Sequence, residues 1–152
     1  MRRLEVRCGR YHPRPRRARA AVRARAGALV PLGETGSPPI VALFQGGGAL
    51  SMRGYYTNRL APMVLQGGQW VPIGGNGLAD GSLELRFDVT RDVGAVLFLD
   101  GGSIGNASAV PTAYQVAVDP TRAQWATGLG LRYRTPFGPL RADVAVRIPE
   151  SL

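Results

Sequence analysis

Hydrophobic and polar residues alternate with a period of two along most of the chain. In SLELRFDV, residues 82–89, leucine, phenylalanine and valine alternate with serine, glutamate, arginine and aspartate. Successive side chains of a β-strand point to opposite faces, so this pattern predicts a half-buried strand. The alternation recurs in AVRARAGALV, ATGLGLRYRT and PLRADVAVRI, while GAVLFLDGG is mostly apolar. The pattern predicts an all-β protein.

The connections between these predicted strands fall into two classes of length. Residues 90–94 and 135–139 are rich in Asp, Pro and Gly, and they predict tight turns. Two glycine-rich loops, at about 33–79 and 102–123, are much longer. Short turns at one end of the strands and long loops at the other are typical of an outer-membrane barrel. The second tight turn carries a turn motif of Pro136, Phe137, Gly138 and Pro139.

Charged residues gather on one face of the predicted strands. Both signs are present, so these side chains can pair across neighbouring strands. Alternation alone fits two architectures: a soluble sheet with its charged face in water, and a lipid-embedded barrel with a polar lumen. The charged face comprises Arg23, Arg25, Glu84, Arg86, Asp88, Asp100, Arg132, Arg134, Arg141, Asp143 and Arg147.

Composition and charge exclude several classes of protein. Hydrophobic residues make up 45% of the 152 residues, which excludes a disordered chain, and no apolar run is long enough for a membrane-spanning helix. The net charge of +9 resides in residues 1–25, which hold ten arginines and one acid, whereas residues 26–152 hold nine of each. Only Tyr11 and His12 accompany these arginines, so we expect no nucleic-acid binding.

The chain has one cysteine and one histidine, which limits the disulfides, metal sites and catalytic triads that it can form. Cys8 is the only cysteine, which excludes an intrachain disulfide and a cysteine-based zinc site. His12 is the only histidine, which excludes a His-based metal site and a Ser-His-Asp triad. The basic N-terminal residues are not followed by the apolar segment that a signal peptide contains.

The segment FQGGGALSMRGYYTNR, residues 44–59, resembles a catalytic loop. A phosphate-binding loop ends in Gly-Lys-Ser/Thr, and this chain has no lysine. The GGGA run resembles the oxyanion loop of patatin-like lipases, but these enzymes also need a nucleophile elbow. The nearest candidate places Ser103 between glycines with no helical pattern after it. We therefore expect no enzymatic activity and no cofactor.

Four motifs in order carry a resemblance to a known family. GGGALSMRGY, SLELRF, AVLFLDGG and GLGLRYRTPFGPLRADVAV resemble the C-terminal β-barrel of BamA/TamA-type outer-membrane assembly factors, the bacterial surface antigen family. The resemblance covers about residues 18–148 and is closer to TamA-like members. It implies an antiparallel meander of roughly six strands, part of a sixteen-stranded transmembrane β-barrel. The implied strands are 1–11, 18–32, 82–89, 94–101, 126–135 and 140–148.

The resemblance also implies an organisation of the chain. Residues 18–152 form a partial outer-membrane barrel, and residues 1–17 form a basic segment, the poorest match, which contains a candidate strand. Family members continue past RIPESL into a final seam strand, and they carry periplasmic repeat domains and earlier strands. We therefore expect the chain to be a fragment that does not act alone and that either aggregates or depends on detergent.

The resemblance implies a lumen site built on a loop motif of Arg53, Gly54 and Tyr55. In the family this loop folds back into the barrel, where its arginine meets acids on the two following strands. Carried over to this chain, those acids are Glu84 and Asp100. A guanidinium offers five donors in a rigid fork, which suits two carboxylates.

The function implied is the insertion or export of β-rich outer-membrane proteins at the bacterial outer membrane. The implied partners are outer-membrane lipid, unfolded outer-membrane protein clients, and a periplasmic or inner-membrane partner of the full-length protein. A second interpretation is the translocator of a two-partner secretion system, which shares the loop motif. From a different class, the alternative is a soluble β-domain with a basic arm that binds nucleic acid.

Overall fold

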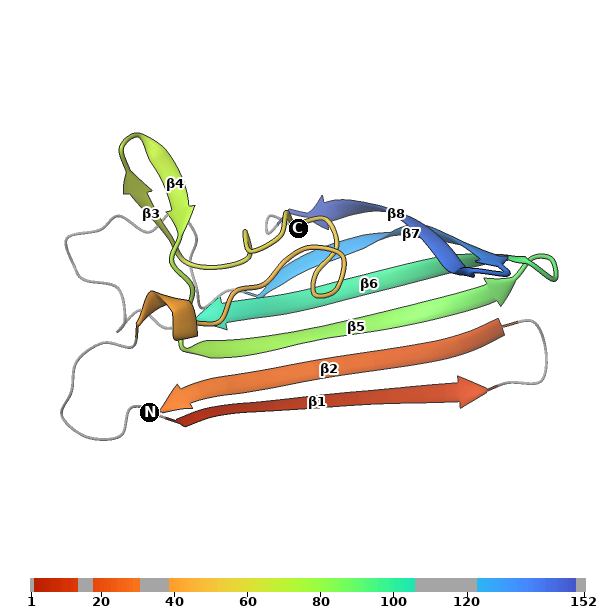
Figure 1. Ribbon diagram of the computed structural model, residues 1–152, viewed down its shortest axis with the longest axis horizontal. Helices are drawn as coiled ribbons and strands as arrows, with labels where there is room; N and C mark the ends of the chain where they lie inside the picture. The colour runs from red at the N-terminus through yellow and green to blue at the C-terminus, as the bar shows by residue number, and fades with distance from the viewer. Residues whose placement is uncertain (1, 14–17, 31–38, 106–122, 150–152) are drawn as a thin grey trace.

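Six long antiparallel strands form one sheet in the computed structural model, which describes residues 2–13, 18–30, 39–105 and 123–149. Neighbouring strands of the sheet also follow one another along the chain, except that a small hairpin stands between the second and third (Figure 1). The predicted all-β antiparallel meander is confirmed. Its strands are β1 (Arg2–Pro13), β2 (Ala18–Val30), β5 (Gly77–Asp88), β6 (Val93–Gly105), β7 (Gln124–Thr135) and β8 (Gly138–Ile148).

Part of the basic N-terminal segment belongs to the sheet. Strand β1 pairs with β2 over its whole length, from Arg2 opposite Val30 to Pro13 opposite Arg19. The remainder of the predicted segment 1–17, residues 1 and 14–17, lies outside the described residues. The ten-arginine stretch therefore contributes an ordered strand, followed by the first residues of β2.

Two strands extend further than the predicted strands at 82–89 and 94–101. Strand β5 begins at Gly77 rather than at residue 82, and β6 runs to Gly105 rather than to residue 101. Glycine and alanine carry little hydrophobic signal, but their backbones continue the ladder from Gly77 opposite Gly105. The predicted loop limits at residues 79 and 102 were therefore wrong, and residues 106–122 of the second loop lie outside the described residues.

The connection between β2 and β5 contains more regular structure than a loop. It includes a 3-10 turn, η1 (Ile40–Ala42), and a hairpin of β3 (Met63–Gln66) and β4 (Gln69–Pro72) that projects away from the sheet (Figure 1). Gly67 and Gly68 link the two strands with φ angles of 58° and 78°, as a two-residue hairpin turn requires. Four-residue strands are too short for an alternation signal, so the sequence did not reveal this hairpin.

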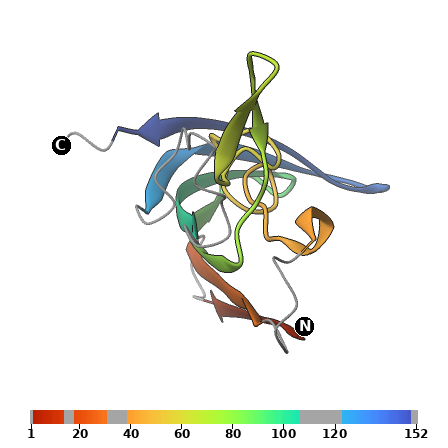
Figure 2. The ribbon, with the colours of Figure 1, turned by 90° about the vertical axis from the view of Figure 1, so that its left-hand side faces the viewer.

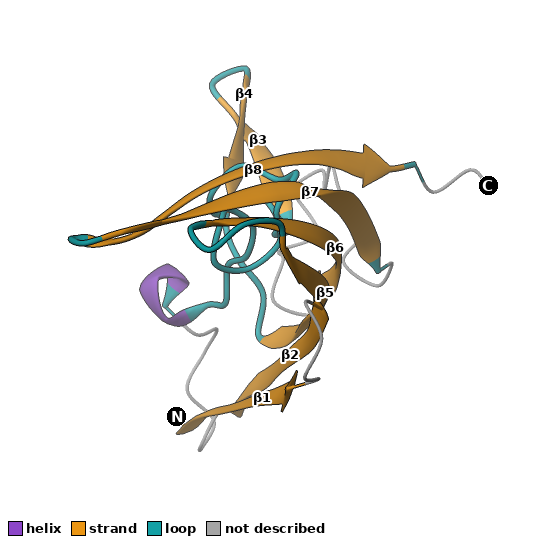
Figure 3. Ribbon diagram, turned by 90° about the vertical axis from the view of Figure 1, so that its right-hand side faces the viewer, coloured by secondary structure: helices purple, strands orange, loops and turns teal. Residues whose placement is uncertain are grey.

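The two faces of the sheet have opposite surroundings. The sheet is curved, and the segment before the β3–β4 hairpin lies against its concave face (Figures 2 and 3). This face carries charged side chains, among them Asp100 and Glu84, which contact that segment. The apolar face is exposed. One cross-strand row on this face spans four strands, and all its members are exposed: Leu85, Leu97, Leu129 and Val144. A soluble sandwich would cover the apolar face and expose the charged one.

Within the described residues, no helix has the length and apolar character needed to cross a membrane.

A small apolar core fastens the long connection to the sheet. Phe44 is 2% exposed and packs with Leu29, Leu78 and Ile104, which come from β2, β5 and β6. The backbone of Phe44 also forms a pair of hydrogen bonds with Gly75, of 2.7 and 2.9 Å. These contacts bring the chain back over the sheet just before the glycine-rich segment begins.

We predict that Phe44→Ala destabilises the folded protein, because it removes the largest side chain of this core. The expected loss in the free energy of unfolding is about 3–5 kcal/mol, as for other buried phenylalanines. The matched control is Phe137→Ala, since Phe137 is fully exposed at a turn and should tolerate truncation. Urea unfolding of the protein in detergent micelles measures both, and equal stability of the two variants would contradict the prediction.

Candidate functional site

The glycine-rich segment folds into a closed loop whose tip reaches the sheet. Gly46 and Leu60 exchange backbone hydrogen bonds of 3.0 and 3.1 Å, which close the loop at its base. The tip, Ser51 to Arg53, is buried even though two of its three residues are polar. We call residues 46–60 the docked loop. Its burial requires polar partners on the concave face of the sheet.

The guanidinium of Arg53 contacts two carboxylates on adjacent strands. Its Nε and Nη2 donate to the two oxygens of Asp100 on β6, both at 2.8 Å, and its Nη1 donates to Glu84 on β5 at 2.7 Å. The backbone N–H of Arg53 also donates to Asp100, at 3.0 Å. Paired charge-assisted hydrogen bonds of this kind are stronger than hydrogen bonds between neutral groups. The structure therefore brings together the three charged residues that the resemblance indicated.

Two further side chains complete the contacts of Arg53. Ser82 accepts a hydrogen bond of 2.8 Å from Arg53 Nη2 and donates one of 2.6 Å to Asp100, its register partner. The ring of Phe98 lies beneath the guanidinium, with 3.6 Å between Arg53 Cζ and the ring centroid. Neither role was predicted from the sequence. Because Ser82 and Phe98 lie two residues from Glu84 and Asp100, the same period of two could have identified them.

The electrostatics keep Arg53 charged. Burial disfavours the charged guanidinium, but hydrogen bonds and attraction from Asp100 and then Glu84 outweigh this and raise the pKa of Arg53. Glu84 is shared with Arg86, whose Nη2 lies 2.7 Å from its second oxygen. Asp143 of β8 lies 3.9 Å from Arg53 Nη1. The loop arginine thus joins a network that spans β5, β6 and β8.

Gly54 lets the chain turn away from the sheet directly after Arg53. Its φ of 91° is unfavourable for residues with a side chain, and an added Cβ would lie 3.0 Å from the Cβ of Ala126. Its carbonyl accepts a hydrogen bond of 2.9 Å from Arg147 Nε on β8. Both the backbone angle and the close approach explain why glycine suits this position.

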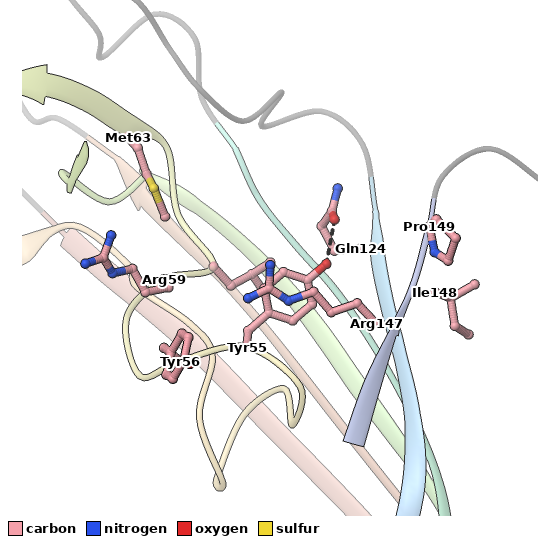
Figure 4. A pocket seen from close by; sticks show the side chains of 9 residues that line it. Tyr55, Tyr56, Arg59, Met63, Gln124, Arg147, Ile148 and Pro149 are labelled. Carbon is pink, nitrogen blue, oxygen red and sulfur yellow. Dashed lines mark hydrogen bonds between the residues drawn. The ribbon is translucent and has the colours of Figure 1, made fainter. Parts of the chain in front are cut away.

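Tyr55 ties the outgoing half of the docked loop to β7 and β8. Its hydroxyl donates to Gln124 at 2.6 Å, and the guanidinium of Arg147 lies 4.2 Å from its ring centroid (Figure 4). These residues line a cleft together with Tyr56, Arg59 and Met63 (Figure 4). The motif Arg53, Gly54 and Tyr55 therefore contacts four strands within three residues.

The predicted turn motif lies apart from this site. Pro136 and Phe137 form the turn between β7 and β8, and Gly138 pairs with Thr135. Gly138 has a φ of 131°, and its carbonyl accepts a hydrogen bond of 2.6 Å from the Thr135 hydroxyl. Pro139 follows as the second residue of β8. This motif shapes the hairpin and is not brought to Arg53.

The segment that resembled a nucleophile elbow is part of a strand. Ser103 lies within β6 and pairs with Ala79 of β5. A nucleophile elbow requires a sharp turn from a strand into a helix. Across the described ranges, no group of three or more His, Cys, Asp or Glu side chains is arranged to hold a metal ion.

We predict that Arg53→Ala lowers the stability of the folded protein, because it leaves Asp100 buried without its main partner. The expected loss is on the order of 3–5 kcal/mol, and smaller if lumen water reaches the carboxylates. Thermal unfolding in detergent, followed by the shift in electrophoretic mobility between folded and unfolded forms, measures this.

The matched control for this substitution is Arg59→Ala. Arg59 belongs to the same loop but is exposed, and its Nη1 donates to the backbone carbonyl of Trp70. It should therefore tolerate truncation. If both variants unfold at the same temperature as the unmodified protein, Arg53 does not stabilise the fold.

Two comparisons with known proteins agree with this geometry. A family model described as the Omp85 superfamily domain matches residues 1–151. Among solved structures, the chain is similar to the crystal structure of BamA from Haemophilus ducreyi lacking POTRA domains 1–3, with a TM-score of 0.79 and 20% identity. The match covers 97% of this chain and 32% of that one, so the chain spans about a third of its length. The structural likeness is one of fold.

Proposed function

The chain belongs to the Omp85 superfamily, and from that premise we propose that it forms part of an outer-membrane barrel that inserts or exports β-rich outer-membrane proteins. The observation that carries this proposal is the inverted arrangement of the sheet. Its concave face is charged and holds the docked loop, whereas its outer face is apolar and exposed. This is the arrangement that a wet lumen and a surrounding lipid bilayer favour.

The length of the strands supports a position in a bilayer. The six strands contain 11 to 13 residues each. A tilted strand needs about 9–11 residues to cross the hydrocarbon core. We therefore propose that β1, β2 and β5–β8 cross the bacterial outer membrane, with lipid as the partner of the row from Leu85 to Val144.

The proposed mechanism uses backbone hydrogen bonds rather than covalent chemistry. An unfolded outer-membrane protein presents extended segments that can pair with an exposed strand edge. Strand exchange of this kind requires no cofactor and no enzymatic step. The docked loop would hold β5, β6 and β8 in place through Arg53 while strands elsewhere in the barrel open. A periplasmic or inner-membrane partner of the full-length protein would deliver the client.

Two alternative functions predict different behaviour of the client and of the N-terminal segment. A two-partner secretion translocator would carry its client across the membrane instead of leaving it inserted. A soluble domain with a free basic arm would leave the N-terminal segment unpaired, and the pairing of β1 with β2 counts against it.

We predict that Leu97→Arg destabilises the protein in lipid vesicles by about 2–4 kcal/mol, the cost of an arginine near the bilayer midplane. Leu97 lies near the middle of β6 on the exposed apolar face. Phe137→Arg, at the turn, should have almost no effect, because a charge there is in water. Urea titration of vesicle-bound protein tests this. A neutral effect of Leu97→Arg would indicate that the apolar face does not contact lipid.

We predict that vesicles containing the full product of the gene accelerate the folding of an unfolded outer-membrane β-barrel client. Arg53→Lys should slow this roughly tenfold, because lysine keeps the charge but loses the fork that contacts two carboxylates, and a tenfold change in rate corresponds to about 1.4 kcal/mol. Arg59→Lys is the control. The heat-dependent mobility of the client measures insertion.

Two results would overturn separate parts of the proposal. Client folding no faster than in empty vesicles would contradict the insertion function. Equal rates for Arg53→Lys and the unmodified protein would contradict the role of the docked loop. A client found protected inside the vesicles would favour the secretion alternative.

A further inference from the structure

A second buried carboxylate lies on the concave face beside the Arg53 site. The side chain of Asp80 on β5 is fully buried and points to the same face as Glu84. It lies between two arginines of β2. Arg23 Nη1 donates to one oxygen at 3.2 Å, whereas Arg25 donates to the other through Nε at 3.0 Å and also through Nη2. Arg25 is the register partner of Asp80.

All three of these side chains also contact the docked loop at one residue. Ser51 Oγ donates to Asp80 at 2.9 Å and accepts a hydrogen bond of 3.0 Å from Arg25. The carbonyl of Ser51 accepts a hydrogen bond of 2.6 Å from Arg23 Nη2. Ser51 stands two residues before Arg53, so this cluster holds the first residue of the loop tip.

We infer that Asp80, Arg23 and Arg25 form a second anchor, which holds the loop at Ser51 and positions Arg53 over Asp100 and Glu84. The functional consequence of this anchor rests on the proposed role of the docked loop. The two anchors share no side chain: one uses Asp80 with arginines of β2, and the other uses Glu84, Ser82 and Asp100. Each can therefore be removed separately.

A second acid of β5 shows that an ion pair can join β2 to β5 without being buried. Asp88, at the far end of β5, also bridges two arginines, Arg19 of β2 at 2.9 Å and Arg134 of β7 at 2.8 Å. It remains 31% exposed, and both of these arginines lie on strands rather than on the loop. Asp80, in contrast, is fully buried and accepts a hydrogen bond from Ser51 of the docked loop. The difference assigns the burial of Asp80 to loop docking.

The two anchors together fix the residue between them. Met52 has its neighbours held on both sides, at Ser51 by the second anchor and at Arg53 by Asp100. Its side chain is 0% exposed and packs with Leu60 and Ala126. An undocked loop would expose Met52, so its accessibility reports docking directly.

The test measures the labelling rate of a thiol introduced by Met52→Cys, using a water-soluble maleimide. The full product of the gene is used, folded in detergent, with the exposed Cys8 replaced through Cys8→Ser. Leu50→Cys in the same background is the accessible reference, since Leu50 is 85% exposed. Heat-dependent mobility confirms that each variant has folded.

We expect Asp80→Asn and Ser51→Ala each to accelerate labelling at position 52 about tenfold, as the loss of a hydrogen bond to a buried charged group implies. Ser51→Ala leaves the ion pairs of Asp80 intact, so it isolates the contact with the loop and is the variant least expected to affect folding. Ser51→Thr keeps the hydroxyl and should restore slow labelling. The matched control Asp88→Asn should label at the original rate.

Unchanged labelling in both Ser51→Ala and Asp80→Asn would overturn the second anchor. Acceleration in Asp88→Asn equal to that in Asp80→Asn would also overturn it, because the effect would then come from weakened pairing of the strands. Labelling does not depend on client insertion. Failure of the insertion assay would therefore contradict the proposed function and leave the anchor standing.

Discussion

The folded structure depends on the burial of one carboxylate, Asp100. Arg53 compensates for the cost of removing this charge from water. The side chain of Asp100 is fully buried and accepts four hydrogen bonds, three from Arg53 and one from Ser82. An unpaired carboxylate there would be strongly destabilising. Because Glu84 on the adjacent strand shares the same guanidinium, one interaction fixes both the loop and the pairing of β5 with β6.

Room for this interaction comes from strand β7, which places the small residues Ala126 and Gly128 on its concave face near the loop tip. A Cβ at Gly128 would lie 2.5 Å from the ring of Phe98, the ring beneath Arg53, and Ala126 packs against Met52 of the loop tip. The outward residues of the same strand are large and exposed, as at Leu129. Small inward residues near the loop tip and large outward residues let β7 support the loop on one side and present an apolar surface on the other. The position of Arg53 is thus prepared by packing as much as by charge.

The sequence allowed much of this to be predicted, within identifiable limits. Alternation placed Glu84 on the charged face, and the four ordered motifs linked it with Asp100 and Arg53. Alternation could not decide which face of the sheet is covered, because a soluble sandwich and a membrane barrel each cover one face. The position of the docked loop decides it. Asp80 was missed because the alanine and glycines around it obscure the strand, although counting back by two from Glu84 reaches it.

The choice of charged rather than apolar contacts for the loop has a physical reason. Apolar contacts are non-directional, so a loop held by apolar side chains could shift along the concave face with little change in free energy. A guanidinium fork, in contrast, needs two carboxylates at one spacing, and a shift of one residue in β6 would turn Asp100 outward. Such a slip would leave Arg53 without its main partner and place a carboxylate in the apolar face. The ion cluster therefore penalises errors of loop position and of strand register together, which suits a barrel whose proposed work involves repeated strand exchange.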